Sequence, residues 1–386
     1  MTQPNERLLT LFNVGTLTFG SGAAKCCAED LMDRGVKHVF IVTTPPTRSL
    51  CDPLLAVIDK RGGAAKIWDN LKGEPTLDEF AEALEKARDF SADAVIGLGG
   101  GSSMDVAKLV AALYDGAQTI DEVIGVDFLK GRSLPLACIP TTAGTGSEVT
   151  PIAILADEAE DLKKGAVSRH LVPDAAYLDP LMTVSMPPAV TAATGFDALT
   201  HCIEAYTNKF AHPIADIYAL AGVRLIADNL ERACKQGDDL AAREAMLLAS
   251  LYGGMCLGPV NTAAVHALAY PLGGEFHIEH GVANALLLPH VLEFNLEAEP
   301  ARYAAIARAL GASDAGDDVT TARRGVEKII DLAECCNIEQ RLSSFGISAE
   351  AIPRMAEAAM TVTRLLERNP RIVTERDAVG IYKAAL

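Results

Sequence analysis

The hydrophobic pattern of this 386-residue chain changes character near Pro187. Upstream of that proline, short runs rich in valine, isoleucine and leucine alternate with stretches whose apolar residues recur at helical spacing. Strands are predicted at residues 37–43, 93–98 and 134–139, and helices at residues 77–90 and 102–114. This alternation predicts a parallel sheet with helices on both faces, because parallel strands need long crossover connections.

Downstream of Pro187 the strand-like runs cease. Helices rich in alanine and leucine, separated by glycine, proline or asparagine, continue to Leu386. We therefore predict two domains, an α/β domain over residues 1–186 and an all-helical domain over residues 187–386.

Composition excludes several classes of partner. The net charge of −17 repels polyanions, so neither nucleic acids nor anionic membranes are expected as partners. No signal peptide is recognisable in residues 1–12, and no apolar run approaches membrane-spanning length. The nine cysteines include no Cys-x-x-Cys pair, which is typical of reduced, mostly buried thiols. We expect a cytoplasmic protein.

A glycine-rich loop joins the strand at 93–98 to the helix that follows. It reads Gly-Leu-Gly-Gly-Gly-Ser over residues 97–102, and its glycines let a pyrophosphate approach the partly positive N-terminus of the helix. Ser102 is expected to cap that helix and Asp105 to form the acidic half of a capping box. The loop departs from the usual Gly-x-Gly-x-x-Gly pattern, since Ser102 takes the last glycine position.

A second polar loop, Pro-Thr-Thr-Ala-Gly-Thr-Gly-Ser-Glu over residues 140–148, follows the strand at 134–139. Its hydroxyls and flexible glycines fall at the carboxyl end of a strand, where open α/β sheets bind their ligands. Two such loops together favour a dinucleotide site over a pair of tight turns.

Four side chains in the second half have the character of metal ligands. Asp197 and His201 lie four residues apart in a helical stretch, so they leave the same face about one turn apart. His266 lies on a second helical run, which Pro271 and the glycine pair after it are expected to end, and His280 opens the next helix. One carboxylate and three imidazoles suit Fe²⁺ or Zn²⁺, with coordination left over for a substrate oxygen.

With both loops and these four residues, the chain resembles the iron-containing (group III) alcohol dehydrogenases, which have a dehydroquinate synthase-like fold. The resemblance covers nearly the whole chain and implies a Rossmann-like dinucleotide-binding N-terminal domain, a metal-binding helical C-terminal domain, and a homodimer or larger assembly. The metal ligands that it implies are Asp197, His201, His266 and His280. The cofactor contacts that it implies are Gly99, Gly100, Gly101, Ser102, Thr141, Thr142, Thr145 and Lys163, the last of these near the cofactor ribose.

Three departures from the family pattern bear on function. Thr44 follows the strand at 37–43, where relatives often carry an aspartate that holds the adenosine 2′-hydroxyl, so both NAD and NADP remain possible cofactors. Tyr270 replaces a histidine found in many members, and Glu74-Pro75 replaces an Asn-Pro pair that often lines the pocket near the nicotinamide. Tyr270 and His277 are the candidates to carry the alcohol proton to solvent.

The expected function is hydride transfer between a small alcohol or aldehyde and NAD or NADP, with Fe²⁺ or Zn²⁺ polarising the substrate oxygen. A negative charge at Glu74 favours neutral substrates over hydroxy acids. The alternatives are a maleylacetate reductase-like enzyme, a hydroxy-acid dehydrogenase, and a metal- and NAD-dependent lyase of the dehydroquinate synthase type. The four ligands disfavour a metal-free maleylacetate reductase, and the motifs at 140–145 and 196–201 resemble the dehydrogenases better than the lyases.

Overall fold

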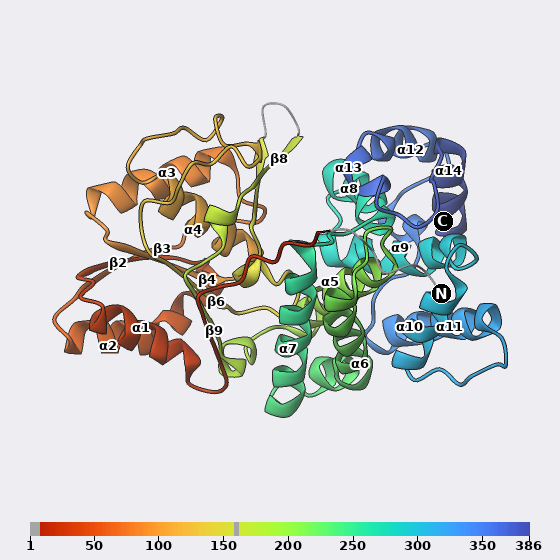
Figure 1. Cartoon of the computed structure of the whole chain (residues 1–386), viewed down its shortest axis with the longest axis horizontal. Coiled ribbons are helices and arrows are strands. Elements are labelled where there is room, and N and C mark those ends of the chain that lie inside the picture. Colours follow the sequence, from red (N-terminus) through yellow and green to blue (C-terminus); the bar gives the residue numbers. More distant parts are fainter. Residues whose placement is uncertain (1–7, 158–161) are drawn as a thin grey trace. The chain divides into compact units, whose positions relative to one another are not determined.

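A computed structural model describes residues 8–157 and 162–386 of the chain (Figure 1). These residues divide into two compact units, Phe12–Ser185 and Met186–Leu386, and residues 8–11 belong with the second.

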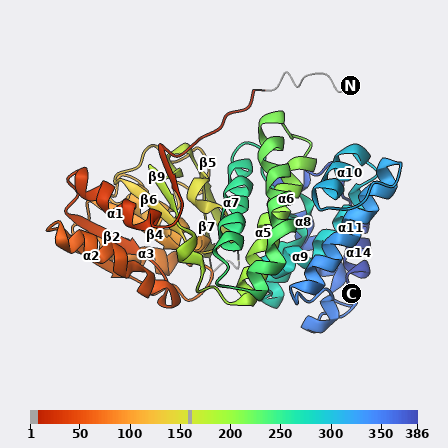
Figure 2. The same ribbon diagram turned by 90° about the horizontal axis from the view of Figure 1, so that it is seen from below.

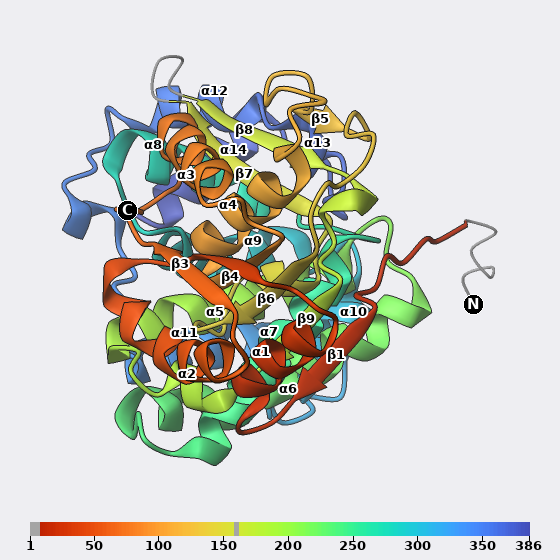
Figure 3. The same ribbon diagram turned by 90° about the vertical axis from the view of Figure 1, so that its left-hand side faces the viewer.

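The unit Phe12–Ser185 is built on a six-stranded sheet in which all neighbouring strands are parallel. In spatial order its strands are β1 (Thr16–Phe19), β9 (Ala175–Leu178), β6 (Leu136–Pro140), β4 (Ala94–Gly99), β2 (His38–Val42) and β3 (Ala64–Trp68). Figure 3 shows β3, β4, β6, β9 and β1 following one another across this unit. The predicted parallel sheet is confirmed, and β2, β4 and β6 are the three strands predicted from the sequence.

Helices cover both faces of this sheet (Figure 1). On one face lie α1 (Ala23–Asp33) and α2 (Asp52–Lys60), and on the other lie α3 (Leu77–Asp89) and α4 (Gly101–Leu113). In β2, Phe40 and Val42 pack toward α3 and α4, whereas Val39 and Ile41 pack toward α1 and α2, because successive strand residues face opposite sides. Each side of the sheet therefore has its own apolar core.

A smaller three-stranded sheet is formed by strands that lie between α4 and β9 in the sequence. Its order is β5 (Gly125–Val126), β8 (Leu162–Val167) and β7 (Ile152–Asp157), with β7 and β8 antiparallel and β5 and β8 parallel. The sequence pattern did not predict these strands.

The unit Met186–Leu386 contains helices and no strand, and the structure describes every residue of this range. Its helices are α5 (Pro188–Thr207), α6 (Pro213–Lys235), α7 (Leu240–Leu257), α8 (Ala264–Phe276), α9 (His280–Asn295), α10 (Pro300–Ala309), α11 (Asp318–Cys335), α12 (Ile352–Met360), α13 (Thr363–Leu366) and α14 (Glu375–Ala384). Figure 2 shows α5, α6 and α7 side by side. The predicted change from α/β to all-helical structure is confirmed.

Among the described residues, α7 is the one helix long and apolar enough to cross a membrane by length and composition. Sixty-one per cent of it is buried inside the protein, against neighbours that include α5 and α6. That burial is typical of the core helix of a helical bundle.

Candidate functional site

The helix α5 carries three buried polar side chains on one face. Asp197, His201 and Glu204 are spaced by four and then three residues, which places them above one another along the helix. All three are nearly inaccessible to solvent. Buried charged groups of this kind need partners, and their partners come from α8 and α9.

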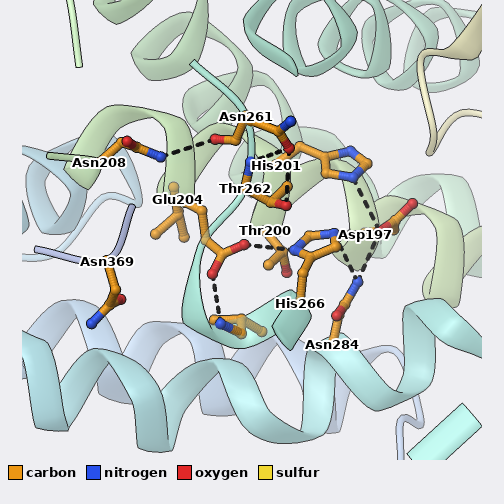
Figure 4. Close-up of polar contacts among 12 residues, drawn as sticks. Asp197, Thr200, His201, Glu204, Asn208, Asn261, Thr262, His266, Asn284 and Asn369 are labelled. Atoms are coloured by element: carbon orange, nitrogen blue, oxygen red, sulfur yellow. Dashed lines mark hydrogen bonds and ion pairs between the residues drawn. The ribbon is translucent and has the colours of Figure 1, made fainter. Parts of the chain in front are cut away.

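The histidines of α8 and α9 meet Asp197 at a single oxygen, and Figure 4 shows His201 and His266 directed toward that carboxylate. Its Oδ1 lies 3.5 Å from Nε2 of His201, 3.6 Å from Nε2 of His266 and 3.5 Å from Nε2 of His280. The rings of His201 and His266 stack with their centres 4.9 Å apart. The structure thus brings together Asp197, His201, His266 and His280, which form the ligand cluster. The side chain of His280 is 36% exposed, so the cluster opens to solvent on that side.

The electrostatics of the ligand cluster favour a cation. Burial alone would raise the pKa of Asp197, but the imidazoles of His201, His266 and His280 hold it well below its usual range. Burial lowers the pKa of His266, but Glu204 and Asp197 outweigh it and raise that pKa to about 9. A buried point that stabilises positive charge and is lined by three imidazole nitrogens and a carboxylate oxygen fits Fe²⁺ or Zn²⁺.

Two residues of this site were missed by sequence reasoning. Glu204 contacts Nδ1 of His266 at 2.6 Å and accepts a hydrogen bond from the backbone N–H of Val265, also at 2.6 Å. Asn284 places its amide Nδ2 2.9 Å from Oδ1 of Asp197, and 3.3 Å and 3.2 Å from Nε2 of His266 and His280. The available signal was spacing, since Glu204 follows Asp197 by seven residues and Asn284 follows His280 by four.

The amide of Asn284 marks the point on which the ligand atoms converge. Its amide nitrogen lies within 3.3 Å of a carboxylate oxygen and of two imidazole nitrogens, which offer lone pairs when the rings are neutral. The pocket is therefore shaped around a positively polarised atom, as a metal site must be.

The candidate proton carriers lie at the end of α8. Tyr270 follows His266 by four residues, so it lies on the same face of the helix, and it is half-buried. His277 is exposed and ends α8 with a backbone φ of 54°, in the left-handed region. The expectation that Pro271 ends this helix was wrong, because α8 continues to Phe276 with the proline inside it.

In the unit Phe12–Ser185, the glycine loop links β4 to α4. Gly99 has φ of +155°, and a Cβ there would lie 2.4 Å from Oγ of Ser103, so a side chain does not fit. The N-cap of α4 is Gly100, without a side-chain cap, and Ser102 lies in the first turn. The expectation that Ser102 caps the helix was therefore wrong.

Asp105 does not belong to a capping box either. Its carboxylate accepts hydrogen bonds from Oγ of Ser147 at 2.7 Å and from the backbone N–H of Ile154 at 3.0 Å. Beside it, the fully buried Lys108 donates to Ser147 Oγ and Thr150 Oγ1 and to two backbone carbonyls, over 2.7–3.1 Å. These two charged residues of α4 thus hold the second loop in place.

The second loop lies directly against the first. The backbone N–H of Thr141 donates to the carbonyl of Gly99 at 2.9 Å. A Cβ at Gly100 would come within 3.5 Å of the side chain of Thr142, and one at Gly101 within 3.0 Å of that of Thr145. The structure therefore brings together Gly99, Gly100, Gly101, Thr141, Thr142 and Thr145. The hydroxyl of Thr141 is buried and has no hydrogen-bond partner among the described residues.

Thr44 and Lys163 occupy two further positions in this unit. Thr44 follows β2, the strand next to β4, and is the N-cap of the short helix Pro45–Cys51, where its Oγ1 lies 2.7 Å from that of Thr47. Lys163, on β8, forms an ion pair with Glu74 in the loop before α3. The negative charge of Glu74 is thus offset by the positive charge of Lys163, which weakens the argument that Glu74 repels anionic substrates.

Comparisons with known proteins agree along the length of the chain. The protein-family model "Iron-containing alcohol dehydrogenase" matches residues 15–180. A second family model, "Fe-containing alcohol dehydrogenase family, C-terminal", matches residues 191–386. The chain is 39% identical to Long-chain-alcohol dehydrogenase 1 of Geobacillus thermodenitrificans over 372 residues, which are 95% of this chain and 94% of that protein.

Solved structures show the same similarity. A structure of 1,3-propanediol oxidoreductase matches with a TM-score of 0.95 at 34% identity and covers 98% of this chain and 100% of its own. Sulfoacetaldehyde reductase from Bifidobacterium kashiwanohense, in complex with NAD+, matches with a TM-score of 0.89 at 28% identity and covers 98% and 99% of the two chains. The similarity therefore includes the fold of both units.

Proposed function

The chain belongs to the iron-containing alcohol dehydrogenase family, and we propose that it transfers a hydride between a small neutral alcohol or aldehyde and NAD(H) at a divalent metal held by the ligand cluster. It is an oxidoreductase of the alcohol dehydrogenase type. The observation that carries the proposal is the convergence of three imidazole Nε2 atoms on one carboxylate oxygen of Asp197.

The side chains of the ligand cluster would hold Fe²⁺, with Zn²⁺ as the alternative, because they offer nitrogen and oxygen donors and no thiolate. When bound, such a cation acts as a Lewis acid on the substrate oxygen and favours loss of the alcohol proton. The protein contributes position and charge, since Asp197, His201 and His266 are buried and held by one another. The partly exposed His280 leaves one side of the cluster open for the substrate.

Charge balance supports neutral substrates. Asp197 and Glu204 are both in contact with His266 of the cluster, and their two negative charges match the charge of a divalent cation. A neutral site has no excess positive charge to attract a carboxylate or sulfonate, and the chain as a whole is strongly acidic. Alcohols and aldehydes without a charged group are therefore favoured over hydroxy acids.

The cofactor contacts proposed from the sequence are supported by the way the two loops pack. Gly99, Gly100, Gly101 and Ser102 precede or open α4, and the threonines of the second loop lie against them. We assign dinucleotide binding to residues 1–186 and metal and substrate binding to residues 187–386. Thr44 supplies neither a carboxylate that excludes the 2′-phosphate of NADP nor a cation that attracts it, so NAD(H) use with tolerance of NADP(H) is expected.

Tyr270 and His277 are proposed to move the alcohol proton between the site and solvent. Tyr270 shares the helix face of His266, and the exposed His277 lies three residues before His280. The exposed imidazole of His277 can exchange a proton with solvent directly, so the relay is assigned more to His277 than to the half-buried Tyr270.

The setting proposed for the enzyme is a cytoplasmic homodimer or larger homo-oligomer. All nine cysteines are free, which suits a reducing compartment. The strand β1 is an edge of the main sheet, and Leu17 on it is 42% exposed, so a second copy has unpaired backbone and apolar surface to cover. Light scattering on the protein as it elutes from a size-exclusion column measures the molar mass of the assembly directly.

The test of function is a panel of neutral alcohols, aldehydes and charged analogues assayed with NAD(H) and NADP(H) on the metal-loaded protein. Alcohols should form reduced nicotinamide from the oxidised cofactor and aldehydes should consume the reduced cofactor, with the neutral compounds preferred. A lyase of the dehydroquinate synthase type returns its cofactor unchanged and accumulates no reduced nicotinamide, so this assay separates the two classes. Clear preference for a carboxylated or sulfonated substrate would contradict the charge argument.

A further inference from the structure

Glu204 is a buried carboxylate beside the ligand cluster to which the proposed reaction gives no chemical step. It lies on α5 three residues after His201, and only 3% of its surface is exposed. Figure 4 shows its side chain reaching the ring of His266. Burying a carboxylate costs free energy unless hydrogen bonds replace its hydration, so its partners indicate its role.

Both carboxylate oxygens of Glu204 contact the first turn of α8. Oε1 accepts from the backbone N–H of Val265, and Oε2 contacts Nδ1 of His266, each at 2.6 Å. The N-cap of α8 is Ala263, which has no side-chain hydrogen bond to offer. Glu204 thus supplies from α5 the acceptor that a capping side chain would supply, at a helix end that favours negative charge. This contact fixes the start of α8 to the helix that carries the first two ligands.

The contact at Nδ1 also determines which nitrogen of His266 is available to a metal. A carboxylate accepts hydrogen bonds, so Nδ1 carries a hydrogen, and Nε2 is the nitrogen whose lone pair a bound metal can take. Nε2 is the atom that faces Oδ1 of Asp197, at 3.6 Å. With its hydrogen on Nε2 instead, the ring would present an N–H to the cation.

We propose that Glu204 is a positioning residue of the metal site, which holds His266 in the tautomer and orientation that offer Nε2 to the cation. Its negative charge, with that of Asp197, balances a divalent ion. The inference rests on the metal assignment of the proposed function and extends it to a residue outside the ligand cluster. Partners of this kind that orient ligating histidines typically contribute 10–100-fold to metal affinity.

The variant Glu204→Gln separates positioning from simple packing. Its carbonyl oxygen still accepts from Val265, so the start of α8 keeps its anchor. Its amide NH₂ then donates to Nδ1 of His266, which forces the ring hydrogen onto Nε2, the nitrogen that faces the cluster. Glu148→Gln is the matched control, because it makes the same change at a fully buried carboxylate in the other unit.

The experiment measures the dissociation constants of Zn²⁺ and Co²⁺ by competition with a chelating indicator, together with the visible absorption spectrum of bound Co²⁺. We expect Glu204→Gln to bind both ions about 10- to 100-fold more weakly, with an altered Co²⁺ spectrum, while Glu148→Gln binds as the unmodified protein does. Unchanged affinity and spectrum in Glu204→Gln would overturn the inference and leave the proposed function intact. Absence of a tight metal ion from the unmodified protein would overturn the proposed function, and this inference with it.

A second measurement needs no variant at Glu204 and remains available should Glu204→Gln fail to fold. In the zinc-loaded protein with isotope-labelled histidine, nuclear magnetic resonance reports which nitrogen of each ring carries hydrogen. The His266 signal is assigned by its disappearance in His266→Ala. We expect a ring protonated at Nδ1 and coordinated through Nε2, and a ring bare at Nδ1 would contradict the role of Glu204.

Discussion

Glu148 is expected to make the stability of the unit Phe12–Ser185 fall as the pH rises. It is the last residue of the second loop, its side chain is fully buried, and neither carboxylate oxygen has a hydrogen-bond partner among the described residues. Burial raises the pKa of Glu148 from its ordinary 4.5 to about 7, against weaker opposing effects of its own backbone and of Lys108. The folded state therefore prefers this side chain protonated.

The magnitude follows from the two pKa values. They differ by about 2.5, and each pKa unit corresponds to ~1.36 kcal/mol, so ionising Glu148 costs the folded state about 3 kcal/mol. Because the folded-state pKa is the higher one, the stabilisation is complete below 4.5 and is lost as the pH rises through 7. In Glu148→Gln this pH dependence disappears, and the variant should be more stable than the unmodified protein by about 3 kcal/mol at ~pH 8 and by about 1 kcal/mol at ~pH 5.

The single tryptophan of the chain makes the assay specific to this unit. Trp68 lies on β3 and is 4% exposed, so its fluorescence reports unfolding of the domain that contains Glu148. Urea titrations at both pH values give the free energy of unfolding for Glu148→Gln and for the matched control Glu85→Gln, an exposed position on α3. The reasoning is refuted if the difference between Glu148→Gln and the unmodified protein is the same at both pH values.

Further predictions concern the cofactor loops and the proton path. Lys108→Met leaves the carboxylate of Asp105, which is 15% exposed, without its cation, and should lower the free energy of unfolding by about 3 kcal/mol. Partial recovery is expected in the double variant Asp105→Asn/Lys108→Met, and a change below about 1 kcal/mol in the same Trp fluorescence assay would contradict the prediction. Thr44→Asp should sharpen the preference for NAD(H), measured as the ratio of kcat/KM values for the two cofactors, and an unchanged ratio would show that Thr44 does not contact the ribose. In pH–rate profiles of alcohol oxidation, His277→Ala should slow the reaction more than Tyr270→Phe, and the reverse order would assign the relay to the tyrosine.

Most strands of the main sheet were predictable where they are buried on both faces, although the buried strand β9, Ala-Ala-Tyr-Leu, was missed. β2, β4 and β6 are central strands with almost continuous apolar runs, and they were recognised. The edge strands β1, Thr-Leu-Thr-Phe, and β3, Ala-Ala-Lys-Ile-Trp, carry mixed patterns and were missed, because an edge strand is only partly buried. Pro271 was misjudged because packing of its buried neighbours Leu268 and Leu272 outweighs the hydrogen bond that a proline removes.

The site shows the same division between local and tertiary information. The four proposed ligands could be named from the sequence because their motifs resemble a family, and the structure brings them together. Glu204 and Asn284 could not, because their importance depends on α8 and α9 being folded against α5. Asp105 was assigned to a local capping box, whereas the structure gives its carboxylate to Ser147, 42 residues further along the chain. Local spacing predicts which side chains share a helix face, but not which distant segment that face will meet.

The central claim is that catalysis depends on a metal ion held by Asp197, His201, His266 and His280. The most direct measurement is alcohol-dependent formation of reduced nicotinamide before chelation, after removal of metal, and after readdition of Fe²⁺ or Zn²⁺, with metal content measured in each sample. We predict that activity disappears with the metal and returns in proportion to the ion rebound, and that His266→Ala folds but recovers neither metal nor activity. Full activity in a preparation shown to be free of metal would contradict the account.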